Sequence, residues 1–387
     1  MPVKNRLAEM HDQITEWRRD LHAHPELMYD LPRTSAFVAE KLRAFGCDEV
    51  VEGIGRSGVV GVIRGRSNST GRAVGLRADM DALPIKEATG LPYTSKTPGR
   101  MHAGGHDGHT AMLLGAAQYL AETRNFDGSA VVIFQPAEEG GAGGKAMVDD
   151  GLMDRFGIDE VYGMHNMPGI PLGSFAIRPG PMMAATDDFD ITLTGIGGHA
   201  AKPHKCIDPV LAASHVVIAL QSIAARSVDP LKQVVVSVCS FRTESDATNV
   251  IPQTVRLRGT VRTMEEDVRD LAETRLKALV ENTAAAFGAT AAIDYQRGYP
   301  VTENDPDCAA FAAEVARAVA GGVEDTAPLM GGEDFSYMLN ARPGAYIFLG
   351  NGDTAAVHHP AYNFDDAAIP YGCSWFAELV ERRLPAA

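Results

Sequence analysis

Three histidines and an aspartate fall within eight residues of the stretch MHAGGHDGHTAMLLGAA, residues 101–117, immediately before an apolar run. They are His102, His106, Asp107 and His109. Imidazole and carboxylate groups at close spacing are the ligands that a divalent first-row metal prefers. A simpler alternative is that the segment only begins a helix, with Asp107 as its N-cap residue.

Further acids and histidines follow apolar segments that we predict to be β-strands. These strands are residues 73–80, 130–135, 161–165 and 345–350. The polar groups that close or follow them are Asp79 and Asp81, Glu138 and Glu139, His165, and His358 with His359. Ligands of open α/β sheets gather at the carboxyl ends of the strands. We therefore expect these groups at one edge of a sheet, where the histidine cluster enters at the N-terminus of a helix.

A hydrolytic metal centre needs one carboxylate that is not a metal ligand, because a base must take the proton of the attacking water and pass it to the leaving group. The adjacent Glu138 and Glu139 can divide these duties, since at a strand end they point in different directions. Asp81 is placed to orient a ligand from behind. A glutamate pair after a strand is often only a solvated turn, so the convergence of all these groups carries the hypothesis. We assign structural roles to His11, His22, His24 and His215.

Two other motifs fail on inspection. The stretch GGAGGKAM, residues 140–147, resembles a phosphate-binding loop, but Glu139 stands where the first glycine of GxxxxGK[ST] is required and Ala146 replaces Ser or Thr. No GxSxG segment occurs, which argues against a serine hydrolase.

The composition is that of a globular protein of 387 residues, 45% hydrophobic and 22% charged, with a net charge of -15. The negative charge and the lack of a basic run argue against nucleic acid or membrane as a partner. The N-terminal segment is predicted to be an amphipathic helix rather than a signal peptide, and we expect no stretch near the about 18 apolar residues of a membrane span. Five scattered cysteines without a CxxC pair indicate reduced thiols and a cytoplasmic location.

The elements that position these residues predict an α/β fold with an inserted module. Strands, the first at 59–65, alternate with helices at 33–46 and 108–122 over the first part of the chain. A different pattern follows, with strands at 189–195, 233–241, 254–262 and 290–298 and helices at 209–225 and 265–287. This order predicts a compact βαββαβ module. We place a discontinuous metal-binding catalytic domain, a mixed sheet flanked by helices, at 1–184 and 298–387, and a lid and dimerisation domain at 185–297.

Nine segments in order along almost the whole chain resemble one known family. They are LRADMDALPI, MHAGGHDGHTAMLLGAA, PAEEG, MHN, GGHAAKPH, NVIP, GTVRT, GGEDFSYM and HHPAYNFDD. The chain is similar to the hippurate hydrolase, N-acyl-amino-acid amidohydrolase and auxin-conjugate hydrolase branch of the aminoacylase/carboxypeptidase metallopeptidases. The resemblance implies a metal-binding α/β domain split by a lid that also dimerises. Because the lid strands offer an edge for pairing, we expect a homodimer, with a tetramer as the alternative.

The resemblance also implies a role for each matching residue. The metal ligands would be His106, Glu139, His165 and His358, the last chosen over His359 because it lies two residues before Pro360. Glu138 would be the general base and acid, and Asp81 the supporting acid. His199 on the lid would hold the oxyanion, in the same or the partner subunit. Substrate-side residues would be Asn249, Arg262 and Gly332.

Gly104 departs from the family pattern, in which a cysteine thiolate usually joins the metal site at this position. Glycine cannot ligate. The change implies one metal ion, a weaker second site, or a site completed by water or Asp107. Without sulfur, the nitrogen and oxygen ligands suit Mn, Co, Ni or Zn comparably, with one or two ions per subunit.

The sequence therefore predicts a metal-dependent amidohydrolase that cleaves N-acyl-L-amino acids, small-molecule substrates, into a carboxylic acid and a free amino acid. Two alternatives stay open. One is a metal-dependent dipeptidase or carboxypeptidase, and the other is a binding homologue with weakened catalysis, because Gly104 replaces the usual cysteine.

Overall fold

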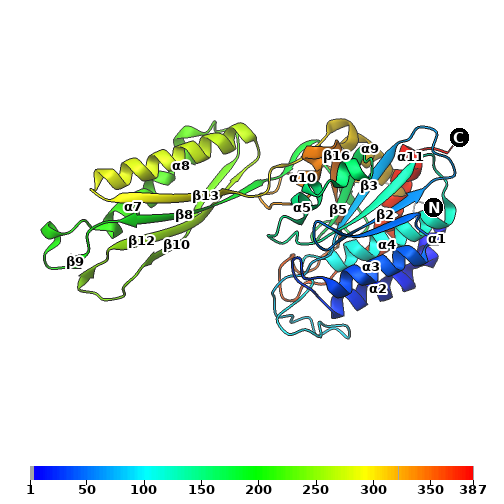
Figure 1. Ribbon diagram of the computed structural model, residues 1–387, viewed down its shortest axis with the longest axis horizontal. Helices are drawn as coiled ribbons and strands as arrows, with labels where there is room; N and C mark the ends of the chain where they lie inside the picture. Colours follow the sequence, from blue (N-terminus) through cyan, green and yellow to red (C-terminus); the bar gives the residue numbers. More distant parts are fainter. Residues whose placement is uncertain (1–3, 321, 387) are drawn as a thin grey trace. The chain divides into compact units, whose positions relative to one another are not determined.

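The computed structural model describes residues 4–320 and 322–386. The chain divides into two compact units (Figure 1). Unit 1 contains residues 1–180, 303–327 and 334–387, and unit 2 contains residues 181–302 and 328–333. The predicted domain boundaries differ, because they place residues 328–333 in the catalytic domain. They cluster with unit 2 because Leu329 and the segment at Met182 pair, with Leu329 N–H donating to the Met182 carbonyl at 2.9 Å.

Unit 1 is built on an eight-stranded mixed sheet, in agreement with the predicted α/β class. In spatial order its strands are β1 (Glu49–Ile54), β2 (Gly58–Arg64), β4 (Ser129–Gln135), β3 (Ala73–Asp79), β5 (Glu160–Met167), β16 (Gly344–Gly350), β6 (Phe175–Ala176) and β15 (Val323–Glu324). The four central strands β4, β3, β5 and β16 are mutually parallel. Their carboxyl ends therefore share one edge of the sheet.

Helices surround this sheet (Figure 1). They are α1 (Asn5–Glu9), α2 (His11–Ala23), α3 (Pro32–Ala44), α4 (His106–Thr123), α5 (Gly143–Asp149), α6 (Leu152–Arg155), α9 (Pro306–Ala320), α10 (Ser336–Ala341) and α11 (Ile369–Arg383), with a 3-10 turn η3 (Asp366–Ala368). Helix α4 is buried on nearly all sides, because its apolar residues pack against α2, α11 and β3. That burial fixes its N-terminus at the carboxyl edge of the sheet.

Unit 2 has the predicted βαββαβ order. Its elements are β8 (Ala185–Thr194), β9 (Gly198–His199), η1 (Pro203–Lys205), α7 (Pro209–Leu220), the π-helical turn η2 (Ile223–Ser227), β10 (Val234–Thr243), β11 (Val250–Ile251), β12 (Thr254–Thr263), α8 (Glu266–Ala286) and β13 (Thr290–Arg297). The sheet order is β10-β12-β8-β13, all antiparallel. Helices α7 and α8 pack on one face of the sheet and bury its alternating apolar residues. Two short strands, β7 (Gly180–Met183) and β14 (Thr302–Asn304), pair as a separate ribbon.

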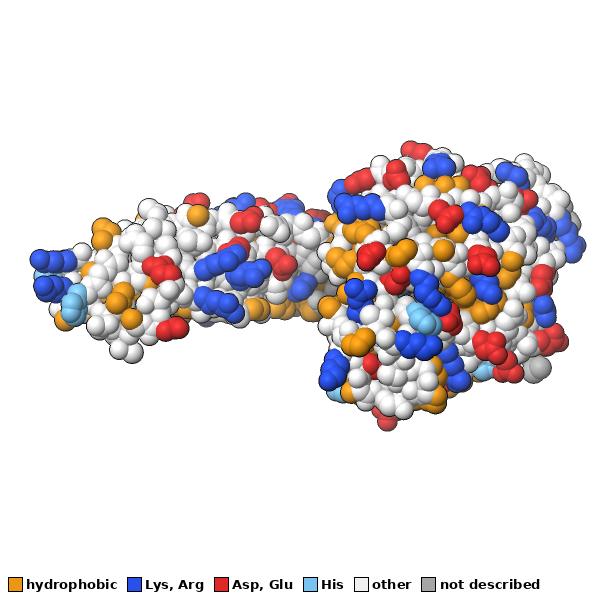
Figure 2. Space-filling model, turned by 60° about the horizontal axis from the view of Figure 1, so that its bottom comes forward, with side chains coloured by type: hydrophobic (Ala, Val, Ile, Leu, Met, Phe, Trp, Pro, Cys, Tyr) orange, Lys and Arg blue, Asp and Glu red, His pale blue; other side chains and the backbone are white. Residues whose placement is uncertain are grey.

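One sequence expectation about unit 2 is wrong. Residues 209–227 form a helical stretch long and apolar enough to cross a membrane by length and composition, although no such stretch was expected. Only 28% of an 18-residue segment of this stretch is buried. Helix α7 leaves Leu211 and Ile218 exposed at 48% and 68%, which marks an apolar surface on unit 2. Elsewhere, on the face of unit 1 seen in Figure 2, acidic and basic side chains are interspersed.

Candidate metal and active site

Asp81 ties together the loops that follow β3 and β4. Its carboxylate accepts hydrogen bonds from the backbone N–H of Glu138 at 2.9 Å and of Glu139 at 3.2 Å, one on each oxygen. The loop turns sharply because Ala137 adopts a left-handed backbone with a φ of 53°. Asp81 is fully buried, and burial raises its pKa. The supporting acid therefore fixes the direction of both glutamates.

His106 is the first residue of α4, and its ring enters among the carboxylates of the two loops. Its Nδ1 lies 3.5 Å from Asp81, and its Nε2 lies 3.9 Å from Glu139 and 4.0 Å from Glu138. Burial lowers the pKa of His106, but the nearby carboxylates of Asp79 and Asp81 raise it to about 10. The preceding Gly105 has a φ of 91°, and a Cβ there would lie 2.1 Å from the Asn166 amide oxygen. Only glycine fits this entry to the helix.

His165 and His358 reach the same edge from the ends of β5 and β16. The His165 Nδ1 contacts the carbonyl oxygen of Asn166 at 2.6 Å, which leaves Nε2 free to act as a ligand. Burial lowers the pKa of His165 well below its ordinary value. His358 has a left-handed φ of 67°, and its Nε2 lies 3.1 Å from Glu139. The neighbouring His359 instead accepts the Ala361 N–H at 3.0 Å within its own turn.

The residues fit a divalent metal centre. Ligand atoms of His106, Glu138 and Glu139 all lie within 4.8 Å of one another, and those of His106 and His165 are equally close. Two ligands at about 2.1 Å from a tetrahedral ion are about 3.4 Å apart. The spacing of 3.1 Å between His358 and Glu139, and of 3.9 Å between His106 and Glu139, brackets that value. The mixed nitrogen and oxygen set suits several first-row metals.

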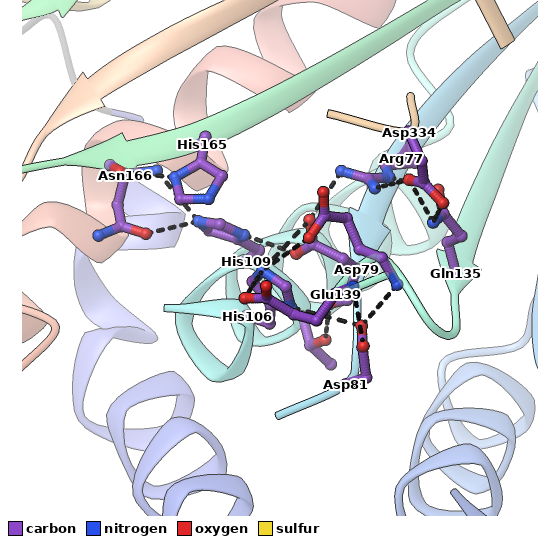
Figure 3. A network of polar contacts seen from close by, with 12 residues as sticks. Arg77, Asp79, Asp81, His106, His109, Gln135, Glu139, His165, Asn166 and Asp334 are labelled. Atoms are coloured by element: carbon purple, nitrogen blue, oxygen red, sulfur yellow. Dashed lines mark hydrogen bonds and ion pairs between the residues drawn. The ribbon is translucent and has the colours of Figure 1, made fainter. Parts of the chain in front are cut away.

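His109 lies within this cluster but is engaged on both ring nitrogens. Its Nδ1 contacts Asp79 at 2.6 Å and its Nε2 contacts the Asn166 side chain at 2.7 Å (Figure 3). A ring held at both nitrogens has no lone pair left for a metal. His109 therefore packs beside His165, with ring centroids 4.6 Å apart, as support.

A buried ion network that the sequence analysis missed lies behind these ligands. Arg77 donates to Asp79 at 2.7 Å and to Asp334 at 3.0 Å, and Gln135 donates to Asp334 at 2.7 Å (Figure 3). Burial raises the pKa of Asp79, but His106, Arg77 and His109 hold it well below its ordinary value. The available signal was Arg77 itself, a charged residue inside an apolar strand. An ionised Asp79 fixes His109 and faces His106.

This geometry can be compared with known proteins. Residues 75–382 match the family model described as peptidase family M20/M25/M40. The chain belongs to that family. It is 41% identical to the hippurate hydrolase of Campylobacter jejuni over 98% of both chains, and 41% identical to an N-acetyl-L-cysteine deacetylase of Bacillus subtilis over 98% of this chain and 90% of that one. A crystal structure described as a dinuclear metal-binding peptidase from the M20 family of B. subtilis superposes with a TM-score of 0.86, at 33% identity, over 98% of this chain and 99% of that chain.

Family membership confirms the predicted resemblance and makes this M20 protein a hydrolase of amide bonds. The fold class is confirmed by the same structural match. The roles of individual residues remain predictions, supported by the geometry described above.

Gly104 of this M20 enzyme lies beside the proposed metal ligands. A Cβ at this position would lie 3.0 Å from His106 Nε2 and 3.1 Å from Glu139 Oε1. A side chain here would therefore extend among the proposed ligands. Asp107, considered above as a substitute ligand, points elsewhere. Its carboxylate contacts His22 at 2.8 Å and Arg18 at 3.5 Å, and both partners are fully buried.

The helix-cap alternative for Asp107 is wrong. Gly105 occupies the N-cap position of α4, without a side-chain cap, and Asp107 lies in the first turn. His22 has a structural role, as expected, between Asp107 and Glu87. His102 is buried beside His22, with ring centroids 6.4 Å apart, and burial lowers its pKa to about 3.

The remaining predicted site residues all belong to unit 2. His199 in β9 pairs with Val250 in β11, and Ala200 N–H donates to the Asn249 carbonyl, so His199 and Asn249 lie side by side. Arg262 lies in β12, opposite Thr186 of β8. Gly332 is required by packing, since a Cβ there would lie 2.2 Å from the Thr186 methyl group.

Proposed function

We propose that this M20 enzyme hydrolyses the amide bond of N-acyl-L-amino acids and releases a carboxylic acid and a free amino acid. The observation that carries the proposal is the Glu138–Glu139 pair, which Asp81 holds by its backbone beside His106. Relatives named hippurate hydrolase, N-acetyl-L-cysteine deacetylase and, at 38% identity over 96% of this chain, IAA-amino acid hydrolase of Arabidopsis thaliana support the substrate class.

His106, Glu139, His165 and His358 would hold the metal. A bound divalent ion polarises the scissile carbonyl and acidifies the attacking water. We propose Mn, Co, Ni or Zn, because the ligands are imidazoles and carboxylates without sulfur. Gly104 favours a single ion or a weak second one.

Glu138 is the proposed proton carrier. It takes the proton of the attacking water and delivers it to the nitrogen of the leaving amine. Its exposed fraction is 8%, so bulk water has little access to the carboxylate. Asp81 holds Glu138 by its backbone N–H, at 2.9 Å, and so fixes the position of the residue that would make this transfer. On unit 2, His199 would stabilise the oxyanion, and Asn249, Arg262 and Gly332 would contact the substrate.

The test is a substrate panel on enzyme that has been stripped with a chelator and reloaded with one metal at a time. N-benzoyl-glycine, N-acetyl-amino acids and dipeptides are compared by kcat/KM. The expected result is metal-dependent release of free amino acid from the N-acyl substrates. Full activity after stripping would refute the metal mechanism.

The same substrate panel tests two alternative functions. Relatives named thermostable carboxypeptidase in Saccharolobus solfataricus, 41% identical over 90% of this chain, favour the peptidase alternative. Faster cleavage of dipeptides would support it. Metal binding without cleavage of any substrate would support the weakened binding homologue that Gly104 suggests.

We further propose a homodimer formed through unit 2, with a tetramer as the alternative. The exposed apolar face of α7 and the unpaired edge of β10 support self-association. A cytoplasmic location is also a proposal, supported by five free cysteines. We propose neither a nucleic acid nor a membrane as a partner.

A further inference from the structure

A tight turn near the N-terminus is fixed to both loops of the active site. Residues 27–30 close with the Asp30 N–H donating to the Leu27 carbonyl at 3.0 Å. Just before the turn, the Glu26 carbonyl accepts the N–H of Ala82, next to Asp81, at 2.8 Å. Within the turn, the Met28 carbonyl accepts the Ala137 N–H at 3.1 Å. The turn is therefore hydrogen-bonded to both loops that carry Asp81, Glu138 and Glu139.

Tyr29 holds the same turn from its other side. Its hydroxyl donates to the Gly141 carbonyl at 2.7 Å, at the far end of the glutamate loop. The Arg56 guanidinium lies over the Tyr29 ring, 4.3 Å from its centroid. A cation on the ring face and a hydrogen bond at the ring edge fix the side chain in one place. The backbone of the neighbouring Met28 is thereby fixed as well.

Met28 occupies this turn at a conformational cost and without contributing a buried side chain. Its φ is 54°, in the left-handed region, which L residues other than glycine rarely adopt. Its side chain is 36% exposed. In the described part of unit 1, Met28 and Leu172 are the only large hydrophobic residues that are exposed. A strained, exposed apolar residue next to a catalytic loop is typical of a functional position.

The thioether lies against the glutamate loop itself. A Cβ at Gly141 would lie 2.6 Å from the Ala137 Cβ and 3.0 Å from the Met28 Cε, so a glycine at position 141 leaves room for both groups. Gly141 is two residues after Glu139. The Met28 methyl group is thus an apolar group in contact with the loop that bears the proposed base.

We propose that Met28 determines specificity by contacting the acyl group of the substrate, and that it favours extended apolar acyl groups, straight aliphatic or benzoyl, over acetyl. This inference rests on the proposed function and names its substrate class. Binding sites for small molecules are mostly apolar, with a few polar groups that fix orientation. The flexible thioether of methionine adapts to chains of different shape, which suits both aliphatic and aromatic acyl groups.

The test compares N-octanoyl, N-benzoyl and N-acetyl derivatives of one amino acid, by kcat/KM, in the metal-loaded full-length enzyme. Met28→Ala should lower the ratio of octanoyl to acetyl, and of benzoyl to acetyl, by about 10-fold, within the range that small apolar contacts supply. Met28→Leu should restore most of both ratios. Met28→Gly, which relieves the backbone strain, should lower them as Met28→Ala does, so that an effect of folding is separated from the loss of the contact.

Leu271→Ala is the matched control, since Leu271 in α8 is also 36% exposed, and it should leave both ratios unchanged. Ratios within 2-fold of the wild type in Met28→Ala and Met28→Gly would overturn the inference alone. A wild-type enzyme that cleaves none of the three substrates would overturn the proposed function, and this inference with it.

Discussion

The carboxylate of Asp81 accepts the backbone N–H of both Glu138 and Glu139, one on each oxygen, at 2.9 and 3.2 Å. One buried side chain thereby fixes the backbone of two successive residues, Glu138 and Glu139. The same carboxylate lies 3.5 Å from His106. Asp81 therefore positions three residues. It holds the proposed base, Glu138, and the proposed ligand Glu139 by their backbone N–H groups, and it faces the ring of the proposed ligand His106.

Asp81→Asn should lower kcat by about 10–100-fold and weaken metal binding by a similar factor, as loss of groups that orient metal ligands does. The amide nitrogen cannot accept the second N–H, so the glutamate loop loses one of its two anchors. Steady-state kinetics at saturating metal and calorimetric titration of the stripped enzyme measure the two effects. Asp150→Asn is the control, since Asp150 also accepts one backbone N–H, from Gly55 at 3.0 Å, away from the loop. Equal kcat in wild type and Asp81→Asn would exclude the positioning role.

Substitution of Glu138 and of Glu139 should have different effects on kcat and on metal content. Glu138→Gln should lower kcat by about 10²–10⁴-fold, the usual contribution of a general base, while the metal content per chain stays the same. Glu139→Gln should lose metal, because Glu139 lies 3.1 Å from His358 and 3.9 Å from His106. Elemental analysis after dialysis distinguishes the variants. Metal loss in Glu138→Gln with retention in Glu139→Gln would reverse the assignment.

The edge of the sheet could be predicted because titratable residues lie at or after the ends of the apolar runs that form its central strands. Parallel strands bring their carboxyl ends together, so the sequence alone predicts that Asp79, His165 and the glutamate pair lie at one edge. The βαββαβ module was likewise visible in the order of its elements.

The support behind the site could not be predicted. The contacts among Arg77, Gln135 and Asp334 join residues up to 257 positions apart, and no local sequence pattern predicts them. The pairing of Asp107 with His22 depends on how α2 packs against α4, and so does the burial of His102. The turn at Met28 depends on a backbone φ that a methionine gives no reason to expect.

Gly104→Cys should increase the number of metal ions per chain or tighten their binding. The Cβ at this position starts 3.0 Å from His106 Nε2 and 3.1 Å from Glu139 Oε1, so a thiolate would lie among the proposed ligands. Thiolate is a strong ligand for zinc and similar metals. Calorimetry with Zn and Mn on stripped protein gives stoichiometry and Kd. Gly104→Ala adds the Cβ without a ligand and controls for crowding. The same stoichiometry and affinity in all three proteins would show that position 104 does not reach the metal.

The stability of the protein should fall as the pH rises from about 6.5 to 9. Burial lowers the pKa of His22, but its hydrogen bonds to Asp107 and Glu87 raise it from 6.5 to about 9. The charged groups and rings that face it are Asp107, Glu87, Arg18, His102 and Tyr93. Because the folded state binds this proton more tightly, the stabilisation is complete below pH 6.5 and is lost as the pH passes the folded pKa.

The loss should approach about 3 kcal/mol in the free energy of unfolding, since one pKa unit corresponds to about 1.4 kcal/mol. Urea unfolding at a series of pH values measures it. His22→Gln should lower stability at pH 6.5 and flatten the decline. A variant whose pH dependence matches that of the wild type would show that His22 does not carry this proton.

Ile218→Lys should convert a dimer into a monomer. Ile218 lies on α7 with 68% of its side chain exposed, so the substitution should cost a single chain no more than about 0.5 kcal/mol. In a dimer that covers α7, the same change buries an unpaired charge, which is strongly unfavourable. Light scattering coupled to gel filtration should then report 41.3 kDa instead of twice that mass. Glu40→Lys on the exposed side of α3 in unit 1 adds a lysine without touching α7 and should keep the wild-type mass. A wild-type chain that elutes as a monomer would exclude the dimer. An Ile218→Lys chain that stays dimeric would show that the apolar face of α7 does not join the two copies.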